Sequence, residues 1–436
     1  MAIRLELADY PVKSVKFGKQ TKYNNGALDI NQEEVLSLIL KDKRIVSADL
    51  ELAFPNEKTR IANVRDVVEP RVKVSGPGAN FPGILGPSDT TGEGRTNRLS
   101  GVAVVASAQY KPTILSGLTA PTCGIIDMWG QGTNVPPYGK LDDVVLVLKL
   151  VDPITEYEAQ EAILSAELKV AVHLAETTKD KEPQNVEVFE LPDVDPTLPR
   201  VVYVCSCACD AYSPHSGVAF YGLSIKDSLP TLVHPNEFID GAVTSDARRG
   251  MGTRITTWQW QNQPVIMQLM KEHGKRLNFL GVILERTEIA SLLGKRIQAA
   301  STAQMARLMR ADGAIITKTT TSGNGFIEVM LTVHECEKKG VKTLLITAEY
   351  GGKDGAELPL VYYAPEATAM VSLGSFERGV TVGVPDKVIG LEPGKLTSLN
   401  PTDPAFSPWS ELTLETYNLT SGIDWFGETY YTCKQY

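Results

Sequence analysis

Residues 264–318 read PVIMQLMKEHGKRLNFLGVILERTEIASLLGKRIQAASTAQMARLMRADGAIITK, and this stretch indicates the fold class most clearly. It opens a series of three helix-strand pairs. The expected elements, alternately helix and strand, are 264–273, 277–284, 294–309, 313–317, 327–339 and 342–347. Such alternation is typical of a parallel sheet covered by helices on both faces. We therefore predict an α/β fold whose C-terminal half is a three-layer α/β/α arrangement around a largely parallel sheet.

The preceding half reads as a mixed, β-rich α/β region. Apolar runs rich in branched residues predict buried strands, and helical spacing or helix-start signals predict helices. The expected strands are 101–108, 142–151 and 200–209, and the expected helices are 31–40 and 154–177. The Gly-, Pro- and Thr-rich segment 75–98 predicts a functional or mobile loop, and the acidic, proline-containing segment 178–199 predicts an exposed connector.

Bulk composition excludes several classes of protein. The 436 residues are 43% hydrophobic and 22% charged, as in ordinary globular proteins, and the net charge of -9 argues against a nucleic-acid partner. No run approaches the roughly 20 apolar residues that a membrane span requires. The N-terminus, MAIRLELADYPVK, has no apolar signal core, so we expect a cytoplasmic protein. Six cysteines are too few for a disulfide scaffold in a chain of this length.

Short segments spread over most of the chain carry a family resemblance. They are VEPRVKVSGPG from Val68, GIIDM from Gly124, VVLVLK from Val144, HPNEFIDGAV from His234, QNQPVI from Gln261, HGKRLNF from His273, TAEYGGKDG from Thr347 and DKVIG from Asp386. In sequence, order and spacing, they resemble the α/β-subunit precursor of the glycine/sarcosine/betaine reductase component B family. The resemblance implies a hetero-oligomeric enzyme whose partner subunit supplies a selenocysteine or cysteine.

The resemblance also implies a processing step, for which this sequence lacks the residue. Precursors of that family cut themselves just before a cysteine, which becomes a pyruvoyl group able to condense with a substrate amine. The cut lies between segments that match Ile239 to Ala242 and Gln261 to Pro264, and the interval here, VTSDARRGMGTRITTWQW, has no cysteine. By residue count, Arg248 occupies the cysteine position, with Ala247 before it. A guanidinium cannot drive an acyl shift, so we predict no cysteine-derived pyruvoyl group.

Ser245 offers one alternative, because a pyruvoyl group can in principle be made from serine. It lies three residues before Arg248. Its hydroxyl would have to be activated in a strained turn. The competing interpretation is that Ser245 merely caps or lines a turn.

Cys205, Cys207 and Cys209 alternate along the expected strand 200–209, and His215 follows. Side chains at spacing two emerge on one face of a strand, about 7 Å apart. Three interpretations stay open: buried core packing, a partial ligand set for zinc or iron with His215, and a reactive thiol. The reductase family has no such cysteine row. His215 is also a candidate general acid or base, or a surface histidine without a role.

A candidate pocket wall follows the expected strand 342–347. Loops at the carboxyl ends of parallel strands commonly bind ligands, and paired glycines let backbone amides approach a substrate. The candidate catalytic residues there are Glu349 and Asp354, and the candidate substrate contacts are Gly351, Gly352 and Lys353. A structural turn is the competing interpretation. Asn324, in a similar loop, and Asp127, carried over from the resemblance, complete the candidate substrate contacts.

These observations divide the chain into an N-terminal region over 1–235, a former processing segment over 236–263 and a C-terminal α/β domain over 264–436. The leading hypothesis is an uncleaved subunit that binds a small amine, amide or N-heterocycle and supports carbon-nitrogen bond cleavage, hydrolytic in one version. One alternative is a non-catalytic scaffold of such a complex. The other is reductive amine cleavage through a serine-derived pyruvoyl group.

Overall fold

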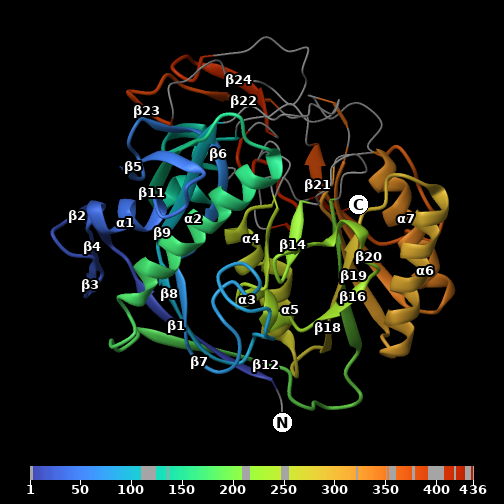
Figure 1. The fold of residues 1–436 in the computed structure, drawn as a ribbon. Coiled ribbons are helices and arrows are strands. Elements are labelled where there is room, and N and C mark those ends of the chain that lie inside the picture. The colour runs from blue at the N-terminus through green and yellow to red at the C-terminus, as the bar shows by residue number, and fades with distance from the viewer. Residues whose placement is uncertain are drawn as a thin grey trace.

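A computed structural model describes residues 3–109, 124–134, 137–208, 217–246, 255–320, 323–349, 351–352, 360–375, 379–390, 407–416, 419–427 and 434–435. Figure 1 shows a β-rich N-terminal part beside an α/β part, with the helices α3 (Pro235–Ile239), α4 (Thr257–Gln261) and α5 (Pro264–Glu272) between them. The segments that flank the former processing site therefore lie where the two parts of the molecule meet.

A seven-stranded sheet forms the α/β part. Its strands, in spatial order, are β16 (Thr231–Val233), β18 (Asn278–Arg286), β13 (Arg200–Cys207), β19 (Gly313–Lys318), β20 (Lys342–Glu349), β21 (Met370–Ser375) and β25 (Lys434–Gln435). The five central strands are mutually parallel, and the two edge strands, β16 and β25, run antiparallel to them. The prediction of a largely parallel sheet is confirmed.

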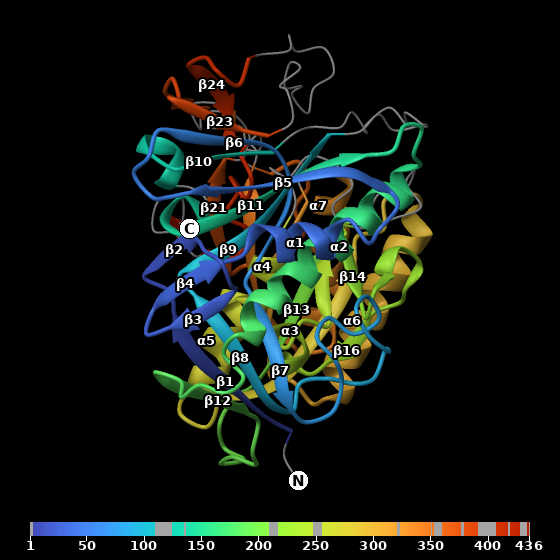
Figure 2. The same cartoon turned by 60° about the vertical axis from the view of Figure 1, so that its left-hand side comes forward.

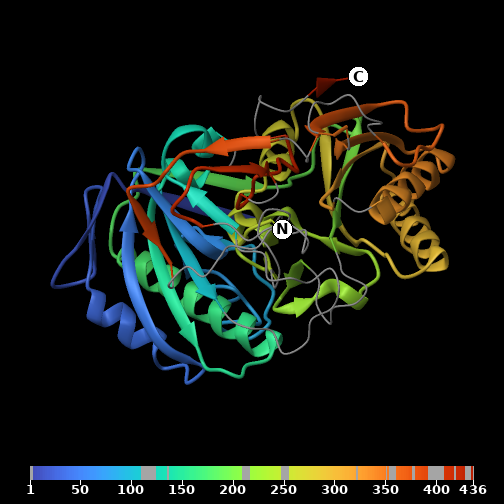
Figure 3. The same ribbon diagram turned by 90° about the horizontal axis from the view of Figure 1, so that it is seen from above.

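Helices cover both faces of this sheet. The side chains of β13 alternate between the two faces, and both sets are buried. Val202 and Val204 point to one face and pack in a cluster with residues of α6 (Leu292–Leu308) and α7 (Gly323–Lys338). Tyr203 and Cys205 point to the other face, toward α4 and α5. Each fully buried valine contributes roughly 1.5–3 kcal/mol through removal of apolar surface from water. Figure 3 shows α6 and α7 on the outer side of the sheet, which confirms the three layers.

The N-terminal part contains a four-stranded and a six-stranded sheet. Their strands are β1 (Arg4–Pro11), β5 (Ile45–Ala53), β6 (Thr59–Val68), β7 (Arg71–Ser75), β8 (Gly94–Ser100), β9 (Val102–Gln109), β10 (Gly124–Asp127), β11 (Asp142–Leu150), β12 (Asn185–Glu190) and β23 (Lys387–Ile389). The helix α2 (Glu156–Glu176) packs against these strands, and α1 (Gln32–Ile39) packs beside it (Figure 2). Asn31 caps α1, and Thr155 with Glu158 forms a capping box at α2.

Small elements complete the described fold. They are the strands β2 (Ser14–Phe17), β3 (Lys22–Asn24), β4 (Ala27–Ile30), β14 (Val218–Phe220), β15 (Leu223–Ser224), β17 (Val243–Ser245), β22 (Gly379–Val382) and β24 (Leu412–Glu415), and the 3-10 helices η1 (Gly130–Asn134), η2 (Tyr138–Lys140) and η3 (Ile225–Asp227). None of the helices in the described ranges is long and apolar enough to cross a membrane.

Two predictions about loops are wrong in part. The expected connector 178–199 contains β12, which pairs antiparallel with β1 and buries Phe189 opposite Leu5. The expected loop 75–98 ends in β8, which pairs parallel with β1. Both strands are stabilised by pairing with residues at the start of the chain, which local composition does not reveal.

The sheets also cross the proposed boundaries between regions. The seven-stranded sheet takes β13 and β16 from before residue 236, and β23 pairs with β6 of the N-terminal part. The division into regions at 235 and 263 stays a prediction.

Candidate functional site

The start of the cysteine-free interval 243–260 lies close to Ala208, the residue that follows β13. In β17, Ser245 lies opposite Val218 of β14. The backbone N–H of Asp246 donates to Gly217 O at 3.1 Å, and the N–H of Gly217 donates to Ala208 O at 3.0 Å. Cys209, His215, Ala247 and Arg248 lie outside the described residues. Ala208, which precedes Cys209, is thus linked through Gly217 to Asp246, which precedes Ala247. These two hydrogen bonds place Ala208 near Asp246.

A buried polar chain holds Ser245. Its backbone N–H donates to Thr257 Oγ1 at 3.0 Å, and Thr257 Oγ1 donates to Asp66 Oδ2 at 2.5 Å. The backbone N–H of Thr257 donates to Asp66 Oδ1 at 2.9 Å. Burial raises the pKa of Asp66 to about 7, although these hydrogen bonds favour its ionised form. The Ser245 hydroxyl is buried and has no hydrogen-bond partner among the described residues.

The QNQP segment connects the two parts of the molecule. Gln261 Oε1 accepts from the backbone N–H of Glu69 at 3.0 Å, and Asn262 Oδ1 accepts from Arg71 at 2.8 Å. Gln263 donates to the Tyr203 hydroxyl at 2.7 Å. Two of the segments that carry the family resemblance, VEPRVKVSGPG and QNQPVI, are therefore in direct contact.

Asp240, in the IDGA segment, anchors the glycine-rich loop. Its carboxylate accepts from the N–H of Gly92 at 2.7 Å and from Thr96 Oγ1 at 2.5 Å, and it also accepts from Thr91 Oγ1 and Lys73 Nζ. Four donors satisfy a carboxylate that is nearly buried. The loop at 75–98 is thus fastened to the segment that precedes the former processing site.

The cysteine pair lies on the α4/α5 face of β13. The sulfur atoms of Cys205 and Cys207 are 3.7 Å apart, so the expected separation of about 7 Å is wrong for this pair. Burial alone would raise the pKa of Cys205, but hydrogen bonds with Cys207, Tyr203 and Thr317 lower it. The described residues contain no group of three or more His, Cys, Asp or Glu side chains that could hold a metal ion. Because Cys209 and His215 lie outside those residues, the metal site stays a prediction.

The candidate pocket wall lies at the carboxyl edge of the seven-stranded sheet. Glu349 ends β20, and Gly351 and Gly352 follow with φ of 142° and 69°. Ser375 Oγ donates to Gly352 O at 2.9 Å, which holds this turn against the end of β21. Asn324 lies in the first turn of α7. Lys353 and Asp354 lie outside the described residues, and the roles of all six predicted residues stay predictions.

Asp127 lies elsewhere, in β10 of the N-terminal part. Arg60 donates to both of its carboxylate oxygens, at 2.7 and 2.9 Å, and also to the backbone oxygens of Pro408, Ser410 and Gly383. Both oxygens are occupied inside the protein, so this geometry favours a structural role over the predicted substrate contact.

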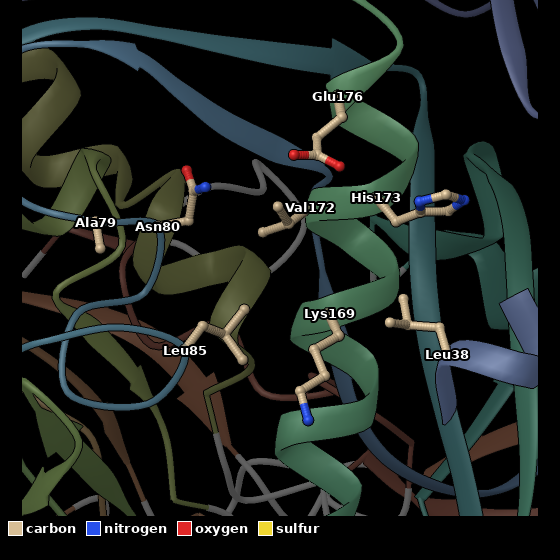
Figure 4. Close-up of a pocket in the computed structure, with 8 residues that line it drawn as sticks. All are labelled: Leu38, Ala79, Asn80, Leu85, Lys169, Val172, His173 and Glu176. Carbon is tan, nitrogen blue, oxygen red and sulfur yellow. The ribbon is translucent and has the colours of Figure 1, made fainter. Parts of the chain in front are cut away.

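A cavity of about 300 Å³ lies between α2 and the glycine-rich loop. Its lining residues are Leu38, Ala79, Asn80, Leu85, Lys169, Val172, His173 and Glu176. Figure 4 shows that Lys169, His173 and Glu176 point in different directions rather than toward one point. None of the residues predicted from the sequence lines this cavity, and its charged groups do not converge on a ligand.

Sequence reasoning missed Asp66, Thr257 and Lys318. Asp66 and Thr257 are 191 residues apart, and nothing local indicates that they bond. Lys318 ends a predicted strand, a position that is usually solvated, yet it is buried. A lysine directly after the apolar run GAIIT was the available signal for it.

Comparison with known proteins gives consistent matches over most of the chain. The family model described as glycine/sarcosine/betaine reductase component B subunits matches residues 3–400. The chain is 36% identical, over 89% of each chain, to the glycine reductase complex component B subunits alpha and beta of Acetoanaerobium sticklandii. It is 34% identical to the sarcosine reductase complex component B subunit alpha of Peptoclostridium acidaminophilum, over 89% of this chain and 90% of that protein. It is also 33% identical to the betaine reductase complex component B subunit alpha of the same organism, over 89% of this chain and 88% of that protein. No solved structure matches the chain.

Proposed function

This chain belongs to the family of glycine/sarcosine/betaine reductase component B subunits, and we propose from that premise that it is an uncleaved subunit of a component B-like complex. Its substrate is a small nitrogenous compound whose carbon-nitrogen bond is broken in the complex. The relatives are named as subunits of multi-subunit reductase complexes, which supports a hetero-oligomer. A partner that carries a cysteine or selenocysteine and a cytoplasmic location belong to this proposal.

One observation carries the proposal: the interval between the IDGA and QNQP segments, residues 243–260, has no cysteine. Without a pyruvoyl carbonyl, the chain cannot activate an amine through an imine. Carbon-nitrogen cleavage then depends on polar groups that stabilise developing charge and on a nucleophile from the partner or from water. An amide or N-heterocycle suits such chemistry better than a simple amine, because its carbon is already electrophilic.

The geometry at Ser245 supports an intact backbone at that position. A serine-derived pyruvoyl would need Ser245 Oγ to attack the carbonyl of Thr244. That carbonyl belongs to the paired strand β17, with Thr244 opposite Ala219 of β14, rather than to a strained turn. The bond from Ser245 N–H to Thr257 further fixes this peptide. Reductive cleavage through a serine-derived pyruvoyl is therefore the weaker alternative.

Exposed apolar residues on α6 support assembly with another polypeptide. Leu293 is 69% exposed, Leu292 is 52% exposed and Ile297 is 45% exposed on this outer helix. Clusters of exposed apolar side chains commonly mark protein-protein interfaces, whereas single exposed apolar residues do not. The same surface suits the second candidate function, a non-catalytic scaffold that assembles or regulates its partner.

Reconstitution tests the proposal. The purified chain is mixed with the component B-like polypeptide encoded beside it, and amine release from candidate amines, amides and N-heterocycles is measured with and without a dithiol reductant. Release that requires both polypeptides supports an enzyme subunit, and release without reductant supports hydrolysis. Unchanged release when this chain is omitted would indicate a scaffold.

A further inference from the structure

The helix α6 presents all its leucine and isoleucine side chains to solvent and its small and polar side chains to the protein. Its buried residues are Lys295, Gln298, Ala299, Thr302, Ala303 and Ala306. Leu293, Ile297 and Leu308 are exposed, Leu308 by 73%. A helix that only covers a sheet normally buries its leucines and isoleucines. The orientation of α6 therefore indicates a second contact on its outer face.

The exposed residues of α6 form one straight stripe. We call Leu293, Ile297, Ala300, Gln304 and Leu308 the α6 stripe, and all five are exposed. At about 100° per residue, they fall within one sector of the helix surface. A rise of about 1.5 Å per residue gives the stripe a length of roughly 22 Å. Because Ala300 near its centre has a small side chain, a second helix can approach α6 closely there.

The edge of the seven-stranded sheet broadens this apolar surface. Leu232 of β16 lies opposite Ile283 of β18, so the two side chains share one face of the sheet. Ile283 packs in a cluster with α6, and Leu232 is half-exposed. Gln298 Nε2 of α6 donates to Ser228 O at 3.2 Å, which places the exposed Leu229 near α6 as well. The surface is therefore wider than one helix.

Arginines lie along one side of the α6 stripe. Arg296 and Arg307 are exposed, and at about 100° per residue both fall on the same side of the stripe. The helix contains no aspartate or glutamate, although the whole chain has a net charge of -9. An apolar patch with a polar rim is typical of a protein-protein interface, and arginine is enriched in such interfaces. Charge complementarity then favours a partner with acidic residues along the matching edge.

A second copy of this chain fits the α6 stripe poorly. Two α6 helices packed antiparallel about a twofold axis would bring the arginines of both copies to the same edge of the contact, where like charges oppose association. Two α6 helices packed parallel would place each row of arginines against the uncharged side of the other helix. Neither arrangement pairs the arginines. An amphipathic helix with acidic residues beside its apolar face pairs them and matches the apolar spacing.

We propose that the outer face of α6 binds an amphipathic helix of the partner polypeptide, with acidic residues of that helix beside Arg296 and Arg307. This inference rests on the proposed function and deepens it, because it assigns the docking surface and the chemistry of the partner. Figure 1 shows α6 on the outer side of the α/β part, away from the N-terminal part. A partner can therefore dock there without displacing any part of the chain that the structure describes.

Binding to the component B-like polypeptide encoded beside this chain tests the inference, measured by biolayer interferometry with the full-length chain. Ile297→Asp should weaken binding about thirtyfold or more, because it places a charge in the centre of an apolar contact. Arg296→Glu should also weaken binding and should reduce its salt dependence. Val46→Asp, at an exposed position of β5, is the matched control and should bind like the wild type. Equal affinity of Ile297→Asp and the wild type, or no binding by the wild type, would overturn the inference.

Hydroxyl-radical footprinting of the unsubstituted complex is a second test that needs no variant. Partner binding should protect Leu293, Ile297 and Leu308 from oxidation and leave Val46 unprotected. The protected segment of the partner should have apolar residues at helical spacing, with aspartate or glutamate beside them. Protection of this chain only at other positions, or a protected partner segment without acidic residues, would contradict the inference.

The outcomes separate this inference from the proposed function. Binding that depends on Ile297, without amine release by the reconstituted complex, would support the docking surface and count against the proposed function alone. Amine release together with unchanged partner binding in Ile297→Asp would overturn the docking surface alone. A dimer of this chain that Ile297→Asp dissociates would also overturn it, because the α6 stripe would then belong to a contact between two copies.

Discussion

The backbone N–H of Ser245 donates to Oγ1 of Thr257, 3.0 Å away, and this bond joins two positions 12 residues apart within the cysteine-free interval 243–260. Asp66 holds Thr257 from the N-terminal part through two further hydrogen bonds. The interval 243–260 is thus held by a buried polar chain that joins Ser245 and Thr257 to Asp66, which is distant from both in the sequence. Such a chain of hydrogen bonds suits a segment whose backbone stays intact.

Thr257→Val should destabilise the protein by about 2–4 kcal/mol, because it leaves the Ser245 N–H and a buried Asp66 oxygen without their partner. Urea unfolding of the full-length chain measures this change. Thr413→Val is the matched control, since the Thr413 hydroxyl bonds Thr381 at an exposed position of β24. The control should stay within about 0.5 kcal/mol of the wild type. Similar losses of unfolding free energy in both variants would show that the buried hydrogen bonds of Thr257 stabilise the protein no more than an exposed bond between hydroxyls.

Glu328→Gln should change how stability depends on pH. Burial and the nearby Glu285 raise the folded-state pKa of Glu328 to about 10, from an unfolded-state value near 4.5. The stabilisation that comes from its protonated form is therefore fully present below pH 4.5 and is lost as pH rises toward 10. The wild type should therefore lose stability relative to the variant by up to about 1.4 kcal/mol per pH unit across that window. Unfolding at pH 5, 7 and 9 measures the difference. Glu335→Gln, on the same helix but partly exposed, should keep the wild-type slope.

Asp240→Ala should loosen the glycine-rich loop. It removes the acceptor of four hydrogen bonds and leaves the amine of Lys73 without its carboxylate, so we expect a loss of roughly 3–5 kcal/mol. Limited proteolysis should then cleave within 75–98 at an increased rate. Asp312→Ala breaks the exposed pair with Arg200 and should cost less than about 1 kcal/mol. An unchanged cleavage pattern in the Asp240 variant would show that the loop is held by other contacts.

The cysteine pair should behave as core rather than as a metal site. Cys205→Ser places a hydroxyl in a buried apolar cluster and should cost about 1–3 kcal/mol, whereas Cys205→Ala should cost less than a large aliphatic truncation. Chelators should leave the melting temperature of the wild type unchanged. Stoichiometric zinc in the purified protein that disappears in both variants would instead establish the ligand set with Cys209 and His215.

Local patterns in the sequence predict the helices and strands whose apolar residues repeat with helical or strand spacing. The helix-strand pairs from 264 to 347 match α5, β18, α6, β19, α7 and β20 within a few residues, because each has a full apolar face. The strands β8 and β12 were missed because they are stabilised by pairing with β1, far away in sequence. The close approach of Cys205 and Cys207 depends on side-chain rotamers, and the bond between Asp66 and Thr257 depends on how two distant segments pack. Neither is encoded in a short motif.

The central claim is that this polypeptide is never cut between its IDGA and QNQP segments. Denaturing mass spectrometry of the purified full-length chain, with a ketone-reactive hydrazide as a second probe, tests it most directly. We predict a single species of 47.4 kDa that does not react with the hydrazide. Two fragments that sum to that mass, one with a hydrazide-reactive N-terminus within 243–254, would contradict the claim.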